Sequence, residues 1–139
     1  MNDARWMRYA WGERGVHEVA GPACQVRIGD YLGTVGLPSN DEIGWCSAFV
    51  NWCLTKAEYR GSGSGLARSW LGWGIPLHNI VYGAVCVFSR GADITQGHVA
   101  FAIDWLPNGE LLCLGGNQQD AVSLQGYDPA TLLGARWQT

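Results

Sequence analysis

The feature that most constrains the fold is the separation of two kinds of pattern along the chain. Segments before Pro76 have the composition and spacing of helices, whereas the apolar runs after it are short and strand-like. Helices followed by strands predict an α+β domain, with N-terminal helices packed on a meandering antiparallel sheet, because a parallel sheet requires the two to alternate. We expect helices at residues 3–12, 25–32, 46–54 and 66–73, and strands at residues 83–88, 98–105, 110–115, 121–124 and 132–137.

The length and composition describe one compact unit. A chain of 139 residues, 47% of them hydrophobic, is long enough to bury one core, so we expect a single domain over residues 1–139. No run approaches the roughly 18 apolar residues of a membrane helix, so no membrane insertion is expected. The N-terminus lacks a basic leader followed by an apolar block, which predicts a protein made in the cytoplasm without a signal peptide. A net charge of −3 provides no basic surface for nucleic acid.

The five cysteines do not have the pattern of structural bridges or metal sites. An odd count without a signal peptide does not indicate a disulfide framework, and no Cys-x-x-Cys pair is present to bind zinc. We therefore expect no metal and no cofactor. Cys53, Cys86 and Cys113 lie among large apolar residues and are expected in the core, whereas Cys24, in a Gly-Pro-Ala loop, suggests no role.

Cys46 opens the most informative segment of the chain. Residues 45–54 are apolar on most sides, which is typical of a helix buried in a core. A helix start stabilises a thiolate through unpaired backbone N–H groups and the helix dipole, and the same groups can bind an oxyanion. This position fits a nucleophile, but it equally fits a small apolar core residue, the usual role of a free cysteine.

His98 is the histidine best placed to act as a base for such a nucleophile. His17 lies in a stretch rich in glycine and charge, and His78 lies in a proline-flanked loop. His98 instead opens a predicted strand, so it is the histidine held on an ordered element. The sequence thus predicts a Cys–His pair across a helix and a strand.

The register of the next strand suggests a third polar residue. Residues 106–109, Leu-Pro-Asn-Gly, fit a type I turn, which would place Trp105 opposite Glu110. Counting back along both strands places His98 opposite Asn117. Directly opposed residues point to the same face about 5 Å apart, so Asn117 would fix the tautomer of the His98 ring.

Small residues on these strands affect that prediction. Alternation puts Ala100 and Ala102 on the same face as His98, and we expect the Cys46 helix to pack in the space they leave. The pair Gly115-Gly116 precedes Asn117. A bulge at these glycines would shift the register by one residue and turn Asn117 away from His98.

Three blocks in a fixed order carry a resemblance to a known family. They are Trp45-Cys46-Ser47-Ala48-Phe49-Val50-Asn51-Trp52, Gly97-His98-Val99-Ala100-Phe101 and Leu114-Gly115-Gly116-Asn117-Gln118, with further similarity at 15–18 and 63–71. The chain resembles the CHAP-like peptidoglycan amidase/endopeptidase family, within the papain-like cell-wall hydrolases that include phage endolysins. The resemblance implies Cys46 as nucleophile, His98 as base and Asn117 as the third polar residue, a position at which many relatives have Glu or Asp.

The implied function is hydrolysis of an amide bond in peptidoglycan by a monomeric catalytic domain. The bond is either the one between muramic acid and L-alanine or one within the stem or cross-bridge peptide, and the reaction passes through an acyl-enzyme without a metal. Candidate substrate-binding residues are Trp45, Asp41 and Trp73. Asp41 and Glu42 equally fit a solvated loop whose charges favour the following helix.

Two other functions fit the same sequence. One is a catalytically silent module that binds the cell wall or a phage structural partner. The other is an injected antibacterial amidase toxin, which would have an immunity protein, whereas a lysis enzyme would work with phage lysis partners. In each case the protein would act on the cell wall or in the periplasm after release or injection.

Overall fold

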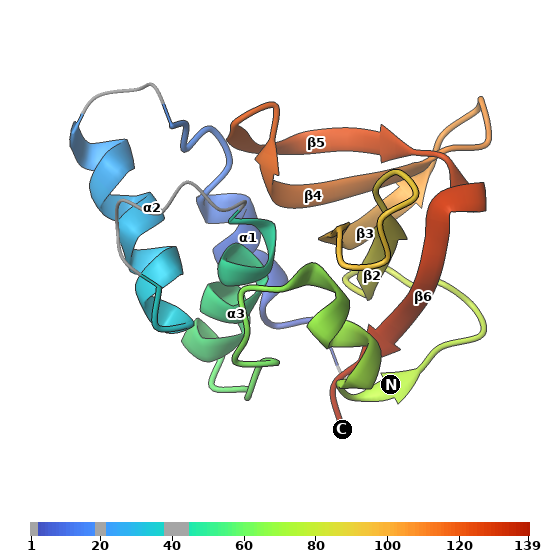
Figure 1. Ribbon diagram of the computed structural model, residues 1–139, viewed down its shortest axis with the longest axis horizontal. Helices are drawn as coiled ribbons and strands as arrows, with labels where there is room; N and C mark the ends of the chain where they lie inside the picture. The colour runs from blue at the N-terminus through green and yellow to red at the C-terminus, as the bar shows by residue number, and fades with distance from the viewer. Residues whose placement is uncertain (1–2, 19–21, 38–44) are drawn as a thin grey trace.

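The computed structural model describes residues 3–18, 22–37 and 45–139. Its three α-helices precede its strands, as the sequence predicts (Figure 1). The helices are α1 (Met7–Gly12), α2 (Pro22–Thr34), α3 (Cys46–Lys56) and the 3-10 helices η1 (Ala67–Gly72) and η2 (Pro129–Thr131). The strands are β1 (Ile75–Pro76), β2 (Val85–Ser89), β3 (Gly97–Trp105), β4 (Leu111–Gln118), β5 (Ala121–Tyr127) and β6 (Leu132–Trp137). The α+β class is confirmed, and β1 and η2 are too short to give a periodic signal in the sequence.

The strands form one antiparallel sheet with the order β1-β6-β2-β3-β4-β5. Strands β2 to β5 follow one another as the predicted meander. Strand β6 then returns to pair with β2 on the side away from β3, as its path in Figure 1 shows. Strands β2 and β3 are therefore in the middle of the sheet, and the start of β3 carries His98.

The β3–β4 hairpin has the predicted register only in part. Trp105 pairs with Leu111 rather than with Glu110, so the loop is one residue longer than expected. A register shift between Ala102 and Asp104 of β3 compensates for the extra loop residue, so Phe101 lies opposite Leu114. This pairing has the predicted register, which would place His98 opposite Asn117.

A second irregularity lies in β4, around Asn117. The pairing of β4 with β5 shifts between Gly115 and Gln118, at the glycine pair where a bulge would change the register. Asn117 has a φ of 57°, in the left-handed region, and the hairpin turn at Gln119 and Asp120 has φ values of 55° and 61°. Side-chain alternation is therefore broken at Asn117.

Helix α3 packs on the face of the sheet that carries Phe101. The rings of Phe49 and Phe101 are 6.3 Å apart, and a Cβ built at Gly116 would lie 2.8 Å from Phe49. Ala100 is on the opposite face, where a Cβ at Gly115 would lie 2.8 Å from its Cβ. The prediction that α3 fills the space beside Ala100 and Ala102 is wrong, because Ala100 and the Gln118 side chain both lie against Gly115 on that face, whereas α3 packs on the other.

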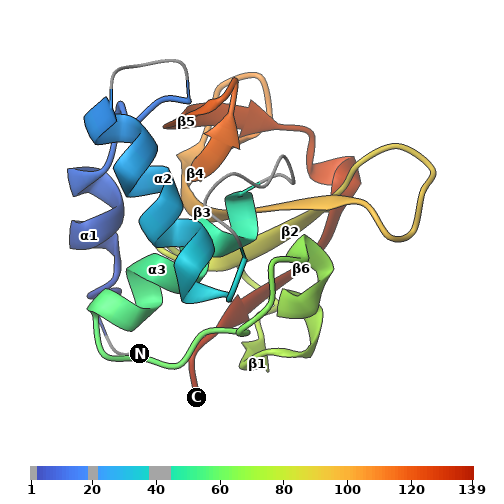
Figure 2. The same cartoon turned by 60° about the vertical axis from the view of Figure 1, so that its left-hand side comes forward.

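Helix α3 is buried on all sides, as its composition predicts. Nine consecutive residues, from Cys46 to Leu54, are buried. The helix contacts β3 and β4 on one side and α2 on the other (Figure 2). On the α2 side, the Tyr31 ring touches Trp45, Phe49 and Trp52. Among the helices of the described ranges, none has the length and apolar character needed to cross a bilayer.

Candidate active site

Cys46 is the first residue of α3, and it is 5% exposed. Its position at a helix start favours negative charge on the sulfur. Burial nevertheless raises the pKa of the Cys46 thiol above its ordinary value, and the backbone N–H of Val99 and the charge of Arg90 offset part of that increase. At neutral pH the group is therefore a thiol rather than a thiolate.

His98 is the second residue of β3 and is 2% exposed. Burial lowers the pKa of His98 to about 4, a hydrogen bond to Gln118 acts in the opposite direction, and the charge of Arg90 lowers it further. The ring is therefore neutral at pH 7. A neutral imidazole has one protonated nitrogen and one nitrogen that accepts a proton.

The start of α3 lies close to the start of β3. The backbone N–H of Val99, the residue that follows His98, is near enough to the Cys46 thiol to lower its pKa. Arg90, directly after β2, lowers the pKa of both Cys46 and His98 and is the charged side chain that acts on both. Because β2 and β3 pair at Ser89 and Gly97, Arg90 lies at the end of the sheet where His98 begins its strand.

The Gln118 side chain determines which nitrogen of His98 is basic. Its Nε2 donates to the backbone carbonyls of Ser123 at 2.6 Å and Cys113 at 3.4 Å, so its Oε1 faces the imidazole. Oε1 lies 3.0 Å from Nε2 of His98. Because a carbonyl oxygen only accepts, Nε2 of His98 carries the ring proton. Nδ1 is then the basic nitrogen, and it is buried without a hydrogen-bond partner among the residues described.

Asn117, the residue expected to bond with the His98 ring, lies immediately before this position. The hydrogen bond to the ring comes from Gln118, which is 1% exposed, whereas Asn117 is half-buried at the left-handed position of the bulge. The glycine pair before Asn117 was the signal for this difference. A bulge there makes the residue after Asn117 the one that faces His98.

Tyr127 completes the surroundings of the imidazole from β5. Its ring stacks on His98 at a centroid distance of 5.1 Å and on Phe88 at 4.7 Å. Its hydroxyl donates to Oε1 of Gln118 at 3.0 Å. His98 is therefore held by an amide at its edge and by an aromatic ring on its face.

This arrangement can perform nucleophilic chemistry with a neutral pair. An imidazole that has an unoccupied basic nitrogen can take the proton of a thiol as the sulfur attacks a carbonyl carbon. The backbone N–H groups at the start of α3 can stabilise the resulting oxyanion. No group of three His, Cys, Asp or Glu side chains within the described ranges is placed to hold a metal ion.

The three residues expected to bind substrate have different positions. Trp45 is 1% exposed, stacks on Tyr31 and donates its indole N–H to Glu18, so it supports the start of α3 from the core. Trp73 is half-buried and donates to the carbonyl of Arg60, which follows the other end of α3. Asp41, together with Glu42, lies outside the described residues.

The other described cysteines belong to the core. Cys53, Cys86 and Cys113 are free thiols with no exposed surface, and burial raises the pKa of each. Cys24 is located in α2. Cys46 is thus the described cysteine that lies at a helix start beside a histidine.

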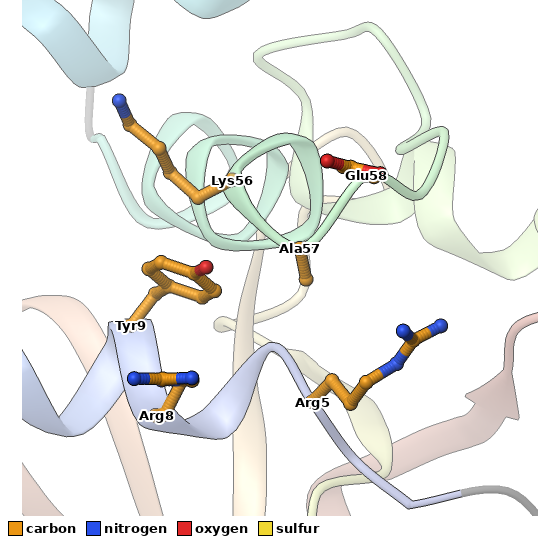
Figure 3. Close-up of a pocket in the computed structure, with 6 residues that line it drawn as sticks. All are labelled: Arg5, Arg8, Tyr9, Lys56, Ala57 and Glu58. Atoms are coloured by element: carbon orange, nitrogen blue, oxygen red, sulfur yellow. The ribbon is translucent and has the colours of Figure 1, made fainter.

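A surface pocket of about 240 Å³ lies between α1 and the C-terminal end of α3 (Figure 3). It is lined by Arg5, Arg8, Tyr9, Lys56, Ala57 and Glu58. Helix α3 has 11 residues, which at 1.5 Å per residue separates this pocket from Cys46 by roughly 15 Å. It is therefore distinct from the Cys46 and His98 site.

Comparison with known proteins agrees with the resemblance seen in the sequence. No curated protein sequence matches the chain. Among solved structures, the wild-type endolysin LysIME-EF1 is similar in fold, with a TM-score of 0.57 and 15% sequence identity. The similarity covers 82% of this chain and 63% of the endolysin chain, so this chain spans less than two thirds of that protein's length. The model of the CHAP domain matches residues 38–117, more than half of the chain, and the protein therefore belongs to the CHAP domain family.

Proposed function

We propose that this protein is a peptidoglycan hydrolase that cleaves an amide bond with Cys46 as nucleophile and His98 as general base. The observation that supports this most directly is the contact between the start of α3 and the start of β3. There a buried thiol lies beside the residue that follows His98, whose Nδ1 has no partner among the described residues. Membership of the CHAP domain family and a fold shared with an endolysin favour peptidoglycan as the substrate.

The reaction begins from two neutral groups. Nδ1 of His98 takes the proton of the Cys46 thiol as the sulfur attacks the amide carbon, and the backbone N–H groups at the helix start stabilise the oxyanion. The C–N bond then breaks as the imidazolium gives its proton to the leaving amine, and a thioester remains. Water, deprotonated by His98, releases the carboxylic acid and restores the thiol.

Gln118 is the orienting residue in this mechanism. Its Oε1 accepts the proton on Nε2 of His98 and so keeps Nδ1 available throughout the cycle. An amide in this position orients the ring without adding a negative charge beside it. We assign this role to Gln118 and not to Asn117.

The test is digestion of purified peptidoglycan, followed by loss of turbidity and by mass spectrometry of the soluble products. Wild-type protein should release products, and the new chain ends would identify the bond as muramoyl-L-alanine or as one within the stem or cross-bridge peptide. Cys46→Ala should abolish digestion, and Cys46→Ser should reduce it by at least about 10³-fold because a hydroxyl is a far weaker nucleophile in this setting. Cys53→Ala provides a control that removes a buried thiol elsewhere in α3.

Two results would contradict the proposal. Digestion that survives Cys46→Ala would remove the nucleophile from the mechanism. Intact wall after incubation with folded wild-type protein that still sediments with it would instead identify a wall-binding module. If digestion occurs, toxicity on export to the periplasm and relief by a co-expressed inhibitor would distinguish an injected toxin from a lysis enzyme.

A further inference from the structure

Tyr127 contacts both the His98 ring and the Gln118 amide that is bonded to it, although it lies on a strand that does not neighbour β3 in the sheet. Its ring covers one face of His98, with 26° between the two planes, and extends over Phe88 of β2. Its hydroxyl reaches Oε1 of Gln118, the same oxygen that faces the ring proton of His98. One side chain from β5 therefore contacts residues of β2, β3 and β4.

We propose that Tyr127 is a positioning residue for His98, acting through its ring on the imidazole face and through its hydroxyl on Gln118. This inference rests on the proposed function, because it assigns Tyr127 a part in the same reaction. The contacts of Tyr127 are with His98, Phe88 and Gln118, so we class it as a positioning residue and not as a catalytic one.

The hydroxyl and His98 share the oxygen of Gln118. The two lone pairs of Oε1 are occupied by the Tyr127 hydroxyl and by the Nε2 proton of His98, each at 3.0 Å. Burial raises the pKa of Tyr127, so the phenol remains protonated and continues to donate. Two donors on one acceptor limit the electron density that Oε1 offers to the imidazolium that forms during the reaction.

The ring excludes water from the imidazole face. His98 is 2% exposed, and its pKa is low chiefly because burial disfavours the charged form. Arg90, after β2, lowers the pKa of His98, and Tyr127 of β5 stacks on its ring. The Cys46 thiol of α3 acts on Tyr127, and no described carboxylate changes the pKa of His98. Removal of the aromatic cover would admit water and favour the charged form.

Two substitutions separate these effects. Tyr127→Phe keeps the ring and removes the hydroxyl, which leaves Oε1 to His98 alone and raises the pKa of His98. Tyr127→Leu removes the ring as well and raises the pKa of His98 further.

We expect Tyr127→Phe to lower kcat by roughly three- to tenfold with little change in KM, because one hydrogen bond to the Gln118 amide is lost. Tyr59→Phe is the matched control, since it removes a hydroxyl that is bonded by Arg5 far from His98.

The deciding measurement is the titration of the His98 imidazole by nuclear magnetic resonance in the full-length protein, with kcat and KM measured in parallel. The order of pKa values should be wild type, then Tyr127→Phe, then Tyr127→Leu, with Tyr59→Phe equal to wild type. A His98 pKa unchanged in both Tyr127 variants, which must themselves remain folded, would overturn the inference. Since this titration requires no activity, an inactive wild type would refute the proposed function while still allowing the role of Tyr127 to be judged.

Discussion

Oε1 of Gln118 lies 3.0 Å from Nε2 of His98, and this contact places the proton on one ring nitrogen and leaves the other free. A carboxylate in the same position would stabilise the imidazolium more strongly, because it adds an opposite charge to the hydrogen bond. Burial keeps the pKa of His98 low, and the hydrogen bond to the neutral amide offsets only part of that decrease. The imidazole is therefore oriented without being protonated at neutral pH.

Substitution of Gln118 should lower the rate far more than substitution of Asn117. Gln118→Leu removes the acceptor for the ring proton, so the imidazole loses its fixed tautomer, and we expect kcat to fall by roughly 10- to 100-fold. Asn117→Gly keeps a residue that tolerates the left-handed φ of 57° and should leave kcat within about threefold of wild type. Steady-state kinetics on a soluble wall fragment would check both. A large loss for Asn117→Gly with Gln118→Leu near wild type would return the orienting role to Asn117.

The stability of the protein should decrease between pH 6.5 and pH 4. His98 has a pKa of about 4 in the folded protein and about 6.5 when unfolded, so in this window the unfolded chain binds the additional proton. Protonation of His98 should lower the free energy of unfolding by an amount on the order of 3 kcal/mol across this window. Below pH 4, His98 should cause no further change with pH. Denaturant unfolding at a series of pH values would measure the slope.

The contribution of His98 to that slope is isolated with two histidine variants. His98→Asn should flatten the dependence, whereas His78→Asn, which removes an exposed histidine, should leave the slope as in wild type. Equal slopes for His98→Asn and wild type would show that this imidazole is not the group responsible.

Removal of the charge at Arg90 should shift both limbs of the pH–rate profile in the same direction. The guanidinium lowers the pKa of Cys46 and of His98, so Arg90→Gln should raise both values, and only slightly because Arg90 is exposed. Arg90→Lys keeps the charge and should retain the wild-type limbs. The effect should decrease in 1 M salt, and limbs that move in opposite directions would contradict this electrostatic account.

The close contact of α3 with the bulged part of β4 should tolerate no additional methyl group. A Cβ at Gly116 would lie 2.8 Å from the ring of Trp45 and from the Cβ of Phe49, so Gly116→Ala should lower the free energy of unfolding by about 1–3 kcal/mol. Gly33→Ala is the matched control at an exposed position of α2, where a Cβ meets nothing within 4 Å, and it should be neutral or stabilising by up to about 1 kcal/mol. Thermal unfolding of both variants would show whether the two changes differ in sign.

Local pattern was sufficient to predict most of the elements and two residues of the candidate site. A helix that is apolar on all sides is recognisable without partners, and this placed Cys46 at the start of α3. The strand that begins at Gly97 follows from β-branched and aromatic residues, and this placed His98 at its start. Both inferences depend only on residues within one element.

The parts that were not predicted depend on contacts between elements. Alternation along β3 shows which residues share a face, but it does not show whether α3 covers the face of Phe101 or that of Ala100. Gln118 faces His98 in place of Asn117 because Asn117 itself has a left-handed conformation. The glycine pair suggested such a bulge but did not require it. Tyr127 lies 29 residues after His98 in the sequence, on a strand that does not neighbour β3, so its stacking on the imidazole has no signal in the sequence.

Strand β5 is the last in the sheet, and beyond its first two residues the described segments provide it with no outer neighbour. It supplies the aromatic cover of His98 and the carbonyl of Ser123 that holds the Gln118 amide. If this edge detached on gentle warming, the imidazole would regain water and its ordinary affinity for protons while the buried helix stayed folded. The proposed Cys46 and His98 pair would then lose its fixed geometry through a local opening well before the rest of the molecule melts.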